Sequence, residues 1–337
     1  MNEALFHKDR GYYRTKNPIG KDSDFITAPE ISQVFGEILA AYILQNFANI
    51  KGPIAFVEMG AGKGTLFKDI LFSIKKLADK KIPEALAFIE SATFHIIEIN
   101  QVLKEIQQEN LSQFSINWHE NFTEFLNHSE TKNRKIFFIS NELFDCFAID
   151  QFVKTDIGWC ERLIDSQQFV TAKFNLEIHQ FVEKLIGFEA SQKAPFGAIF
   201  EYSKSAQDFM EQLCDALQKQ GGIAINFDYG YRKTEFANTL QAVKNHQKIN
   251  VLENVEEADI TALVDFSSLE KIVLDYKLSS SLISQQEFLM ALGIEERRKI
   301  LLQGKSNAEK NEINLAINRL IEKDQMGELF KCLIVWK

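Results

Sequence analysis

A glycine-rich segment that follows a short apolar run offers the first candidate for ligand binding. The run from Ile54 to Glu58 has the length and composition of a buried strand, and Thr65 to Leu77 has apolar residues at helical spacing. Between them the chain reads Gly60, Ala61, Gly62, Lys63 and Gly64. Glycine tolerates positive φ angles and lets the backbone approach a ligand closely. The segment therefore predicts a ligand-binding loop between a strand and a helix.

Two phosphate-binding loops resemble this segment but fit it poorly. A P-loop requires a glycine where Val57 stands, and a β-branched side chain tolerates positive φ poorly. The carboxylate of Glu58 would also repel a triphosphate. A dinucleotide-binding loop requires a third glycine where Thr65 stands, and Glu84, the acid near the expected distance, does not close a second strand. Both ligands are therefore disfavoured.

S-adenosyl-L-methionine (SAM) fits the same residues better. This ligand carries a sulfonium cation, an ammonium group and no phosphate, so a carboxylate at Glu58 attracts it. Glu98 closes a second apolar run, Ala92 to Ile99, where its two oxygens can accept hydrogen bonds from the two ribose hydroxyls. Solvated acids at strand ends are the alternative interpretation. The loop and the two acids together predict a SAM-binding site.

Further polar residues stand at the ends of the next two strand-like runs. They are Asn141, Glu142 and Asp145 after the run at 136–139, and Asp228 and Tyr229 at the end of the run that begins at 223. An α/β sheet presents functional side chains at the carboxyl ends of its strands, so these residues are candidates for binding and catalysis. The alternatives are a helix-terminal acid for Glu142 and a packed ring for Tyr229.

Other segments spread along nearly the whole chain carry a family resemblance. In order, they are GYYRTKNPIGKDSDFITAPEISQVFGE from Gly11, VEMGAGKGTL from Val57, SNELFDCFAIDQFV from Ser140, GWCERLI from Gly158, INFDYGY from Ile225, NTLQAVKNH from Asn238, ADITALVDFSSL from Ala258, FLMALGI from Phe288 and MGELFK from Met326. Together they resemble the MidA-type SAM-dependent methyltransferases, which include a mitochondrial arginine methyltransferase that assists assembly of respiratory complex I. Leu263 stands where members of that family usually carry histidine, so a role for that imidazole is not carried over.

The resemblance implies a fold, a reaction and a partner. The fold is α/β, of the class I SAM-dependent methyltransferases, which are Rossmann-like with a seven-stranded, mostly parallel sheet. The reaction is methyl transfer to an arginine of a protein, with a respiratory complex I subunit as the expected target, and a homodimer is a further expectation. The alternatives are methylation of another protein or a small molecule, or a SAM-binding assembly chaperone without turnover.

Roles for individual residues follow from this resemblance. A guanidinium substrate needs carboxylates that orient it and localise a lone pair on one nitrogen, because arginine otherwise stays protonated. Glu142 is the first choice for this role, and the other catalytic candidates are Asp145, Asp228, Tyr229 and His246. The expected cofactor contacts are Glu58, Gly60, Ala61, Gly62, Gly64, Thr65, Glu98, Asn141, Thr27 and Pro29. A structural histidine is the alternative for His246.

Two polar segments are expected to border the site. Asp24, Phe25, Thr27, Pro29 and Glu30 are interpreted as a lid over the cofactor, with helix capping as the alternative for Thr27. Asp259, Thr261 and Asp265 are expected beside the acceptor cleft, with capping of a helix near Ser267 as the alternative.

Composition excludes several classes of function. The 38 basic and 47 acidic residues give a net charge of −9, which disfavours nucleic acid and anionic membranes as partners. No apolar stretch is long enough to insert into a membrane. The four cysteines lack C-x-x-C spacing, so the sequence indicates reduced, buried thiols and no metal site. The expected location is the cytoplasm of a bacterium, or the mitochondrial matrix for a processed eukaryotic protein.

Strands alternate with helices over the first half of the chain, which predicts a parallel sheet in a single methyltransferase domain, residues 1–337. The expected parts are an N-terminal arm, lid and helix at 1–50, a SAM-binding half at 51–150, an antiparallel insertion at 151–200, the second half of the sheet at 201–265, and a helical cap with a final strand at 266–337. One helix is expected from Ala28 to Phe47.

Overall fold

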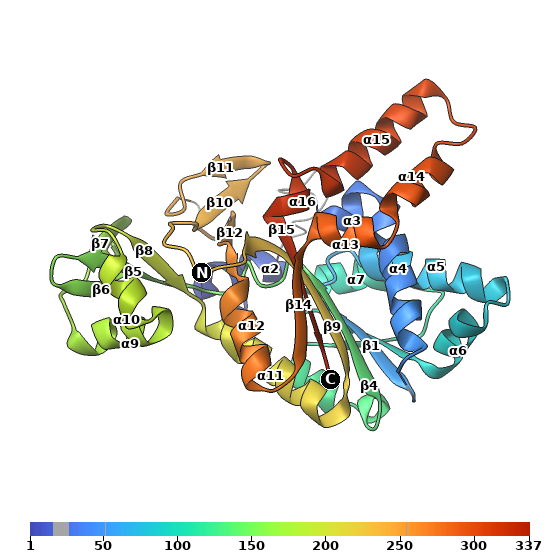
Figure 1. Ribbon diagram of the computed structural model, residues 1–337, viewed down its shortest axis with the longest axis horizontal. Coiled ribbons are helices and arrows are strands. Elements are labelled where there is room, and N and C mark those ends of the chain that lie inside the picture. Colours follow the sequence, from blue (N-terminus) through green and yellow to red (C-terminus); the bar gives the residue numbers. More distant parts are fainter. Residues whose placement is uncertain (16–26, 51, 254) are drawn as a thin grey trace.

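A twisted central sheet organises the chain (Figure 1). The computed structural model describes residues 1–15, 27–50, 52–253 and 255–337. The main path of the sheet has the order β14-β15-β9-β4-β1-β2-β3. These strands are β1 (Ile54–Met59), β2 (Thr93–Ile97), β3 (Ile116–His119), β4 (Lys135–Asn141), β9 (Gly222–Tyr231), β14 (Ser279–Ser284) and β15 (Phe330–Trp336). The short β13 (Val264–Asp265) pairs with β9 as well.

The direction of the strands matches the expected fold class. β1 pairs in parallel with β2 and β4, β2 with β3, and β4 with β9. β15 runs antiparallel to both β9 and β14. The prediction of a Rossmann-like, mostly parallel seven-stranded sheet is therefore confirmed, with β13 as an additional two-residue strand. Because β1, β2, β4 and β9 all run in the same direction, their carboxyl ends meet at one edge.

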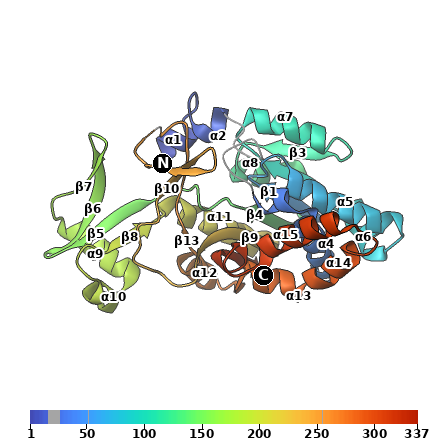
Figure 2. The same cartoon turned by 90° about the horizontal axis from the view of Figure 1, so that it is seen from above.

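Helices cover both faces of this sheet (Figure 2). One face carries α3 (Ala28–Ile31), α4 (Gln33–Phe47), α5 (Thr65–Asp79), α6 (Pro83–Ser91), α13 (Gln285–Ala291), α14 (Ile294–Leu301), α15 (Asn307–Ile321) and α16 (Met326–Leu329). The other face carries α8 (Phe122–Asn127), α11 (Lys204–Gln220) and α12 (Phe266–Asp275). α7 (Gln101–Asn110) follows β2, and the 3-10 turn η1 (Ser129–Thr131) follows α8.

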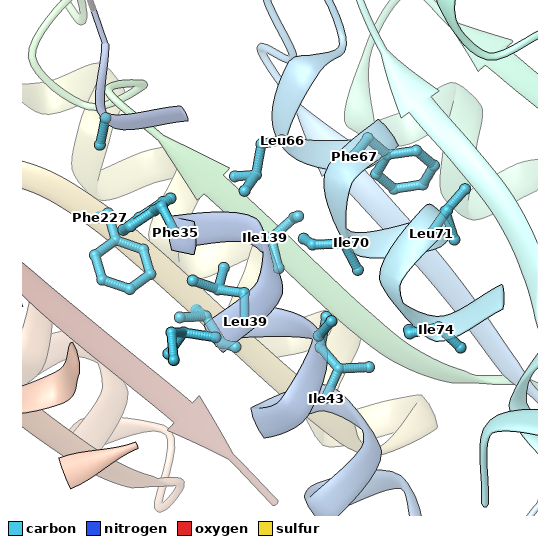
Figure 3. Close-up of a cluster of buried hydrophobic side chains, with 14 of the residues drawn as sticks. Phe35, Leu39, Ile43, Leu66, Phe67, Ile70, Leu71, Ile74, Ile139 and Phe227 are labelled. Carbon is cyan, nitrogen blue, oxygen red and sulfur yellow. The ribbon is translucent and has the colours of Figure 1, made fainter. Parts of the chain in front are cut away.

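Alternating side chains of the strands divide the core between the two faces. In β1, Phe56 belongs to the cluster under α4 and α5, whereas Ala55 and Val57 belong to the cluster under α11 and α12. Figure 3 shows the first cluster, in which Phe35 of α4 lies beside Phe227 of β9, and Ile139 of β4 lies between Phe35 and Ile70 of α5. This packing fixes the start of α5, and with it the glycine loop, above the end of β1.

Two antiparallel sheets stand outside the central one. The first contains β5 (Asp150–Thr155), β6 (Gly158–Asp165), β7 (Gln168–Thr171) and β8 (Ile199–Tyr202), with α9 (Leu176–Ile186) and α10 (Phe188–Lys193) beside it. The second contains β10 (Gln241–Lys244), β11 (Gln247–Ile249) and β12 (Asp259–Thr261). The N-terminal helices α1 (Asn2–Phe6) and α2 (Tyr12–Thr15) pack on this second sheet through a shared apolar cluster.

Three local expectations need correction. The predicted helix at 28–47 is divided, because Ser32 is extended (φ −159°, ψ 130°) and its hydroxyl accepts the Val34 N–H at 3.3 Å as the cap of α4. The second antiparallel sheet interrupts the segment expected to complete the central sheet. β14 interrupts the expected helical cap. Its SSSLIS sequence has no strong apolar pattern, and the segment forms a strand because it pairs with β15.

All four cysteines are buried and outside disulfides, as expected from their spacing. Within the described residues, no helix is both long and apolar enough to cross a membrane.

Candidate functional site

A pocket lies over the carboxyl ends of β1, β2 and β4. Its wall includes most of the residues that the sequence assigned to the cofactor: Thr27, Pro29, Glu58, Gly60, Ala61, Gly62, Thr65, Glu98 and Asn141. Glu30 and Glu142 also line it. Sequence reasoning missed the remaining wall, which is mostly apolar: Phe6, Tyr13, Met59, Lys63, Leu66, Ile97, Ile99, Leu103, Leu143, Cys146 and Phe147. Parallel strands therefore bring residues that are distant in the sequence to one site.

The glycine loop turns sharply from β1 into α5. Gly60, Gly62 and Gly64 have φ angles of 72°, 54° and 76°, a region that favours glycine. Gly64 is the N-cap residue of α5 and lies against Gln107, outside the pocket wall. The loop thus has the close-approach backbone that the sequence predicted, while Gly64 serves the turn into the helix.

Glu58 is a nearly fully buried acid at the base of this loop, with 2% of its surface exposed. The Phe67 N–H, in the first turn of α5, donates to its carboxyl group. Its Oε2 atom has no hydrogen-bond partner among the described residues. Burial, with a smaller contribution from the charge of Glu98, raises the pKa of Glu58 to about 8. A buried oxygen without a partner, beside a pocket, favours a cationic or hydrogen-bond-donating ligand.

Glu98 stands just beyond β2 and is held by a buried network. Its Oε1 accepts the Asn100 N–H at 2.9 Å, and its Oε2 accepts Gln107 Nε2 at 3.1 Å. Gln107 Nε2 also donates to the Gly62 carbonyl at 2.8 Å, and Gln107 Oε1 accepts Trp118 Nε1 at 3.0 Å. Burial raises the pKa of Glu98 to about 7 despite these hydrogen bonds. Gln107 therefore ties the acid to the glycine loop.

Gln107 was not identified from the sequence. It lies on a helix with mixed polar residues, and only its complete burial distinguishes it from its neighbours. The signal in the sequence that could have identified Gln107 is a polar residue at a position that helical spacing places on the inner face of α7.

The expected lid is described in part. Asp24 and Phe25 lie outside the described residues. Thr27 is 8% exposed and makes no side-chain capping bond to α3, so the capping alternative does not hold for it. Glu30 accepts a hydrogen bond from the hydroxyl of Thr65, which links the segment before α4 to the start of α5.

Glu142 lies at the end of β4 in an unusual backbone conformation. Its φ of 54° is in the left-handed region, which costs a non-glycine residue about 1–2 kcal/mol. Its N–H donates to the Phe227 carbonyl at 2.9 Å, and its Oε1 accepts Asn141 Nδ2 at 3.0 Å. The side chain is half-buried and lines the pocket. Burial, with the nearby charge of Asp145, raises the pKa of Glu142 to about 8.

Three of the other catalytic candidates lie behind this segment, outside the pocket wall formed by the described residues. Asp228 is fully buried and accepts the N–H groups of Phe144 at 2.7 Å, Asp145 at 3.2 Å and Tyr229 at 2.9 Å. The Tyr229 hydroxyl donates to Asp145. These contacts make Asp228 and Tyr229 positioning residues for the 142–146 segment, so direct contact with the reacting groups is not supported for them. Asp145 differs, because its Oδ1 is buried and has no hydrogen-bond partner among the described residues.

His246 does not belong to the wall of the pocket. It is exposed in the turn between β10 and β11, with a φ of 60°. The sequence placed it in the site because it ends the segment NTLQAVKNH that resembles the family, but the structure places it in a hairpin turn. The other acids differ in their contacts. Asp259 Oδ1 accepts the hydroxyl of Tyr13, a residue of the pocket wall, at 2.6 Å, whereas Asp265 Oδ1 caps α12 through Ser267 N–H at 3.1 Å. Capping, the alternative, therefore holds for Asp265.

A second hollow lies on the other side of the 142–147 segment. Its wall includes five acids and two lysines, together with Leu263, the residue that departs from the family pattern: Asp145, Glu201, Glu211, Asp265, Asp275, Lys184 and Lys271. Tyr202 and Tyr231 also line it. The segment that carries Glu142 thus separates the pocket beside the glycine loop from an acidic hollow.

The strand order and the glycine loop define a class I, Rossmann-like methyltransferase fold. The family model described as "Putative S-adenosyl-L-methionine-dependent methyltransferase" matches residues 38–283, and the chain belongs to this family. The resemblance to the MidA-type enzymes is thereby confirmed, and so is SAM as the cofactor.

Comparisons over the full chain agree with this family. A crystal structure of a Burkholderia thailandensis protein bound to S-adenosyl-homocysteine has a TM-score of 0.83, covers 100% of this chain and 86% of that chain, and is 23% identical, which shows the shared fold. A relative from Danio rerio, named protein arginine methyltransferase NDUFAF7, mitochondrial, is 29% identical over 348 residues, covering 98% of this chain and 81% of the relative. The relative of the same name from Homo sapiens is 28% identical, covering 98% and 77%.

The pocket residues fit this cofactor. The unpartnered Oε2 of Glu58 suits a ligand with cationic groups, and the glycine loop allows the backbone to approach the ligand closely. The carboxylate oxygens of Glu98 can accept hydrogen bonds from vicinal hydroxyls. The apolar part of the wall, such as Leu103 and Phe147, suits the adenine ring.

Proposed function

We propose that this protein is a SAM-dependent protein arginine N-methyltransferase whose target is a subunit of respiratory complex I. The observation that carries the proposal is the half-buried carboxyl group of Glu142, which faces the same pocket as Glu58 and Glu98. The names of the relatives support arginine as the acceptor. The acidic hollow beyond Asp145 supports a basic peptide as the substrate.

The chemistry assigned to the chain is mainly alignment and exclusion of water. SAM supplies, when bound, a methyl group on a sulfonium sulfur. The Glu142 carboxylate would accept N–H groups of the guanidinium, orient one nitrogen and localise its lone pair. Binding of the cationic guanidinium beside Glu142 would lower its raised pKa and favour the ionised form. Asn141, whose amide donates to Glu142 Oε1, would hold that carboxyl group in place.

Methyl transfer from tritiated SAM to a cell extract tests this proposal, with Glu142→Gln beside the wild type and Glu105→Gln as a control for an exposed acid. We expect labelled protein with the wild type and the control, and loss of at least about 100-fold with Glu142→Gln, because removal of one oriented charge-assisted group costs several kcal/mol in a transition state. Calorimetry should show unchanged SAM binding in Glu142→Gln.

The same experiment separates the alternatives. Tight SAM binding with no labelled protein would favour the assembly chaperone, and label confined to small molecules would favour a small-molecule methyltransferase. Mass spectrometry of complex I subunits from a strain that lacks this protein identifies the target. An unchanged set of methylated arginines in those subunits would contradict complex I as the target.

Two further parts of the proposal concern assembly and location. A homodimer is supported by large apolar side chains exposed on and near the first antiparallel sheet, including Phe188 at 69% and Phe196 at 80% exposure. Light scattering after gel filtration measures the mass directly, and a 38.7 kDa species would contradict the dimer. We place the protein in the cytoplasm of a bacterium, or in the mitochondrial matrix if its source is eukaryotic. Fractionation of the source cells tests this.

A further inference from the structure

Three histidines from different elements converge at the β2–β3 edge of the central sheet. His95 lies in β2, His119 ends β3, and His128 follows α8. One ring nitrogen from each lies within 4.8 Å of the other two. These residues are outside the wall of the pocket described above. They belong to no part of the proposed methyl transfer.

The spacing suits a tetrahedral metal ion. His95 Nδ1 and His119 Nε2 are 3.0 Å apart. Around Zn²⁺, with Zn–N bonds of about 2.0–2.1 Å, two tetrahedral nitrogen ligands are separated by about 3.4 Å. The two buried nitrogens are therefore close to ligand spacing, and all three histidines offer ring nitrogens within 4.8 Å of one another. Three imidazoles with one open position form a donor set that Zn²⁺ prefers.

The contacts of the two buried rings define what an ion would have to displace. His95 Nε2 lies 2.9 Å from the Thr93 hydroxyl, so a proton on Nε2 can be donated there, which leaves Nδ1 as a lone pair. His95 Nδ1 is hydrogen-bonded to His119 Nε2, so in the metal-free protein one of these two nitrogens carries a proton, and an arriving ion would displace it. Phe125 packs edge-on against both rings, with centroids 5.2 Å from His95 and 5.7 Å from His119.

The histidine cluster is reachable from the solvent and is linked through the backbone to Glu98. His128 is half-buried, so an ion can enter from the solvent beside it. His95 and His119 are buried at 0% and 3% exposure, so the surrounding protein holds both imidazole rings in place. The His119 carbonyl accepts the Glu98 N–H at 2.9 Å, so an ion held at His119 would stiffen the strand end that carries Glu98.

We propose that His95, His119 and His128 bind one Zn²⁺ ion, with water in the fourth position. The ion would cross-link β2, β3 and the segment after α8, and its role would be structural, since the site lies apart from the cofactor pocket. The sequence did not predict this site, because the expectation of no metal rested on the cysteines.

Titration of the full-length protein with ZnCl₂, after chelator treatment and gel filtration, tests the proposal. His128→Asn is the chosen variant, because asparagine can accept the Glu130 N–H that His128 Nδ1 accepts at 3.4 Å. His7→Asn is the matched control, since His7 Nδ1 accepts the Asp9 N–H at 3.2 Å in the same i, i+2 arrangement.

We expect one equivalent of Zn²⁺ in the wild type and in His7→Asn, with a higher melting temperature of both when the ion is bound. His128→Asn should bind at least about 100-fold more weakly, since loss of even an outer-shell partner costs 10–100-fold. Co²⁺ should give tetrahedral absorption bands in the first two proteins. Equal affinity in all three proteins, octahedral Co²⁺ spectra or substoichiometric binding would overturn the proposal. Circular dichroism confirms that each variant is folded.

Discussion

The raised pKa of Glu58 predicts that SAM binding strengthens as pH rises from 6 to 8. In the ligand-free protein the pKa of Glu58 is about 8, because the carboxyl group is buried beside Glu98. The cationic groups of SAM favour the ionised carboxylate. With that pKa, roughly half of the Glu58 side chains are ionised at pH 8 and about one in a hundred at pH 6. The contribution of Glu58 to the affinity should therefore change about 50-fold across this range.

Calorimetry in chelator-treated buffer measures this dependence. The ratio of SAM dissociation constants at pH 6 and pH 8 is determined for the wild type, for Glu58→Gln, and for Glu105→Gln, which removes an exposed acid on α7. We expect the wild-type ratio to exceed that of Glu58→Gln by about 50-fold, and the control to match the wild type. At pH 7, two buffers of different ionisation enthalpy should reveal proton release on binding by the wild type.

Parallel pH profiles for the wild type and Glu58→Gln would refute the reasoning. They would mean that the unpartnered Oε2 of Glu58 interacts with neither cationic group of the cofactor, and that this acid serves only the start of α5. A variant that fails to bind SAM at either pH would be assessed by its urea unfolding curve, because Glu58 also accepts the Phe67 N–H. Loss of binding with unchanged stability would still support the direct role.

Two further predictions concern buried polar groups. Gln107→Leu removes hydrogen bonds to Glu98 and Gly62, so it should weaken SAM binding by about 10-fold and lower the free energy of unfolding by about 1–3 kcal/mol. Calorimetry measures the affinity and urea unfolding measures the stability. An unchanged affinity would contradict a positioning role for Gln107. Glu142, with its pKa raised to about 8, keeps a proton on folding, so the ligand-free protein should lose stability as pH rises from about 4.5 to 8. Glu142→Gln should lessen that loss of stability. Urea unfolding of both proteins at four pH values measures the change, and a wild-type stability that rises with pH would contradict the prediction.

Local patterns predicted the sheet and the glycine loop well. The strand from Ile54, the loop from Gly60 and the helix from Thr65 follow one another in the sequence, so periodicity and glycine content suffice to identify them. Glu98 was also found, because an acid at the end of a parallel strand shares an edge with the loop. The site roles assigned to these residues stay predictions, although the pocket brings them together.

Other features depend on distant pairing. β14 is a strand because β15 pairs with it, and its serine-rich sequence carries no signal of its own. Gln107 matters because Trp118 and Gly62 surround its amide. Glu142 follows β4 and Asp228 lies within β9, yet only Glu142 lines the pocket, since its left-handed φ turns the chain there while Asp228 binds backbone N–H groups.

The sequence by itself determined the alternation of strands and helices and the cofactor loop, because these depend on residues that are neighbours in the chain. The class I methyltransferase fold followed from the family resemblance. The tertiary structure decided which acids share a pocket, how the 142–147 segment separates it from the acidic hollow, and where His246 lies. It also gathered His95, His119 and His128, whose separation in the sequence conceals any relation. Such features arise from contacts between strands and helices that only the folded chain brings together.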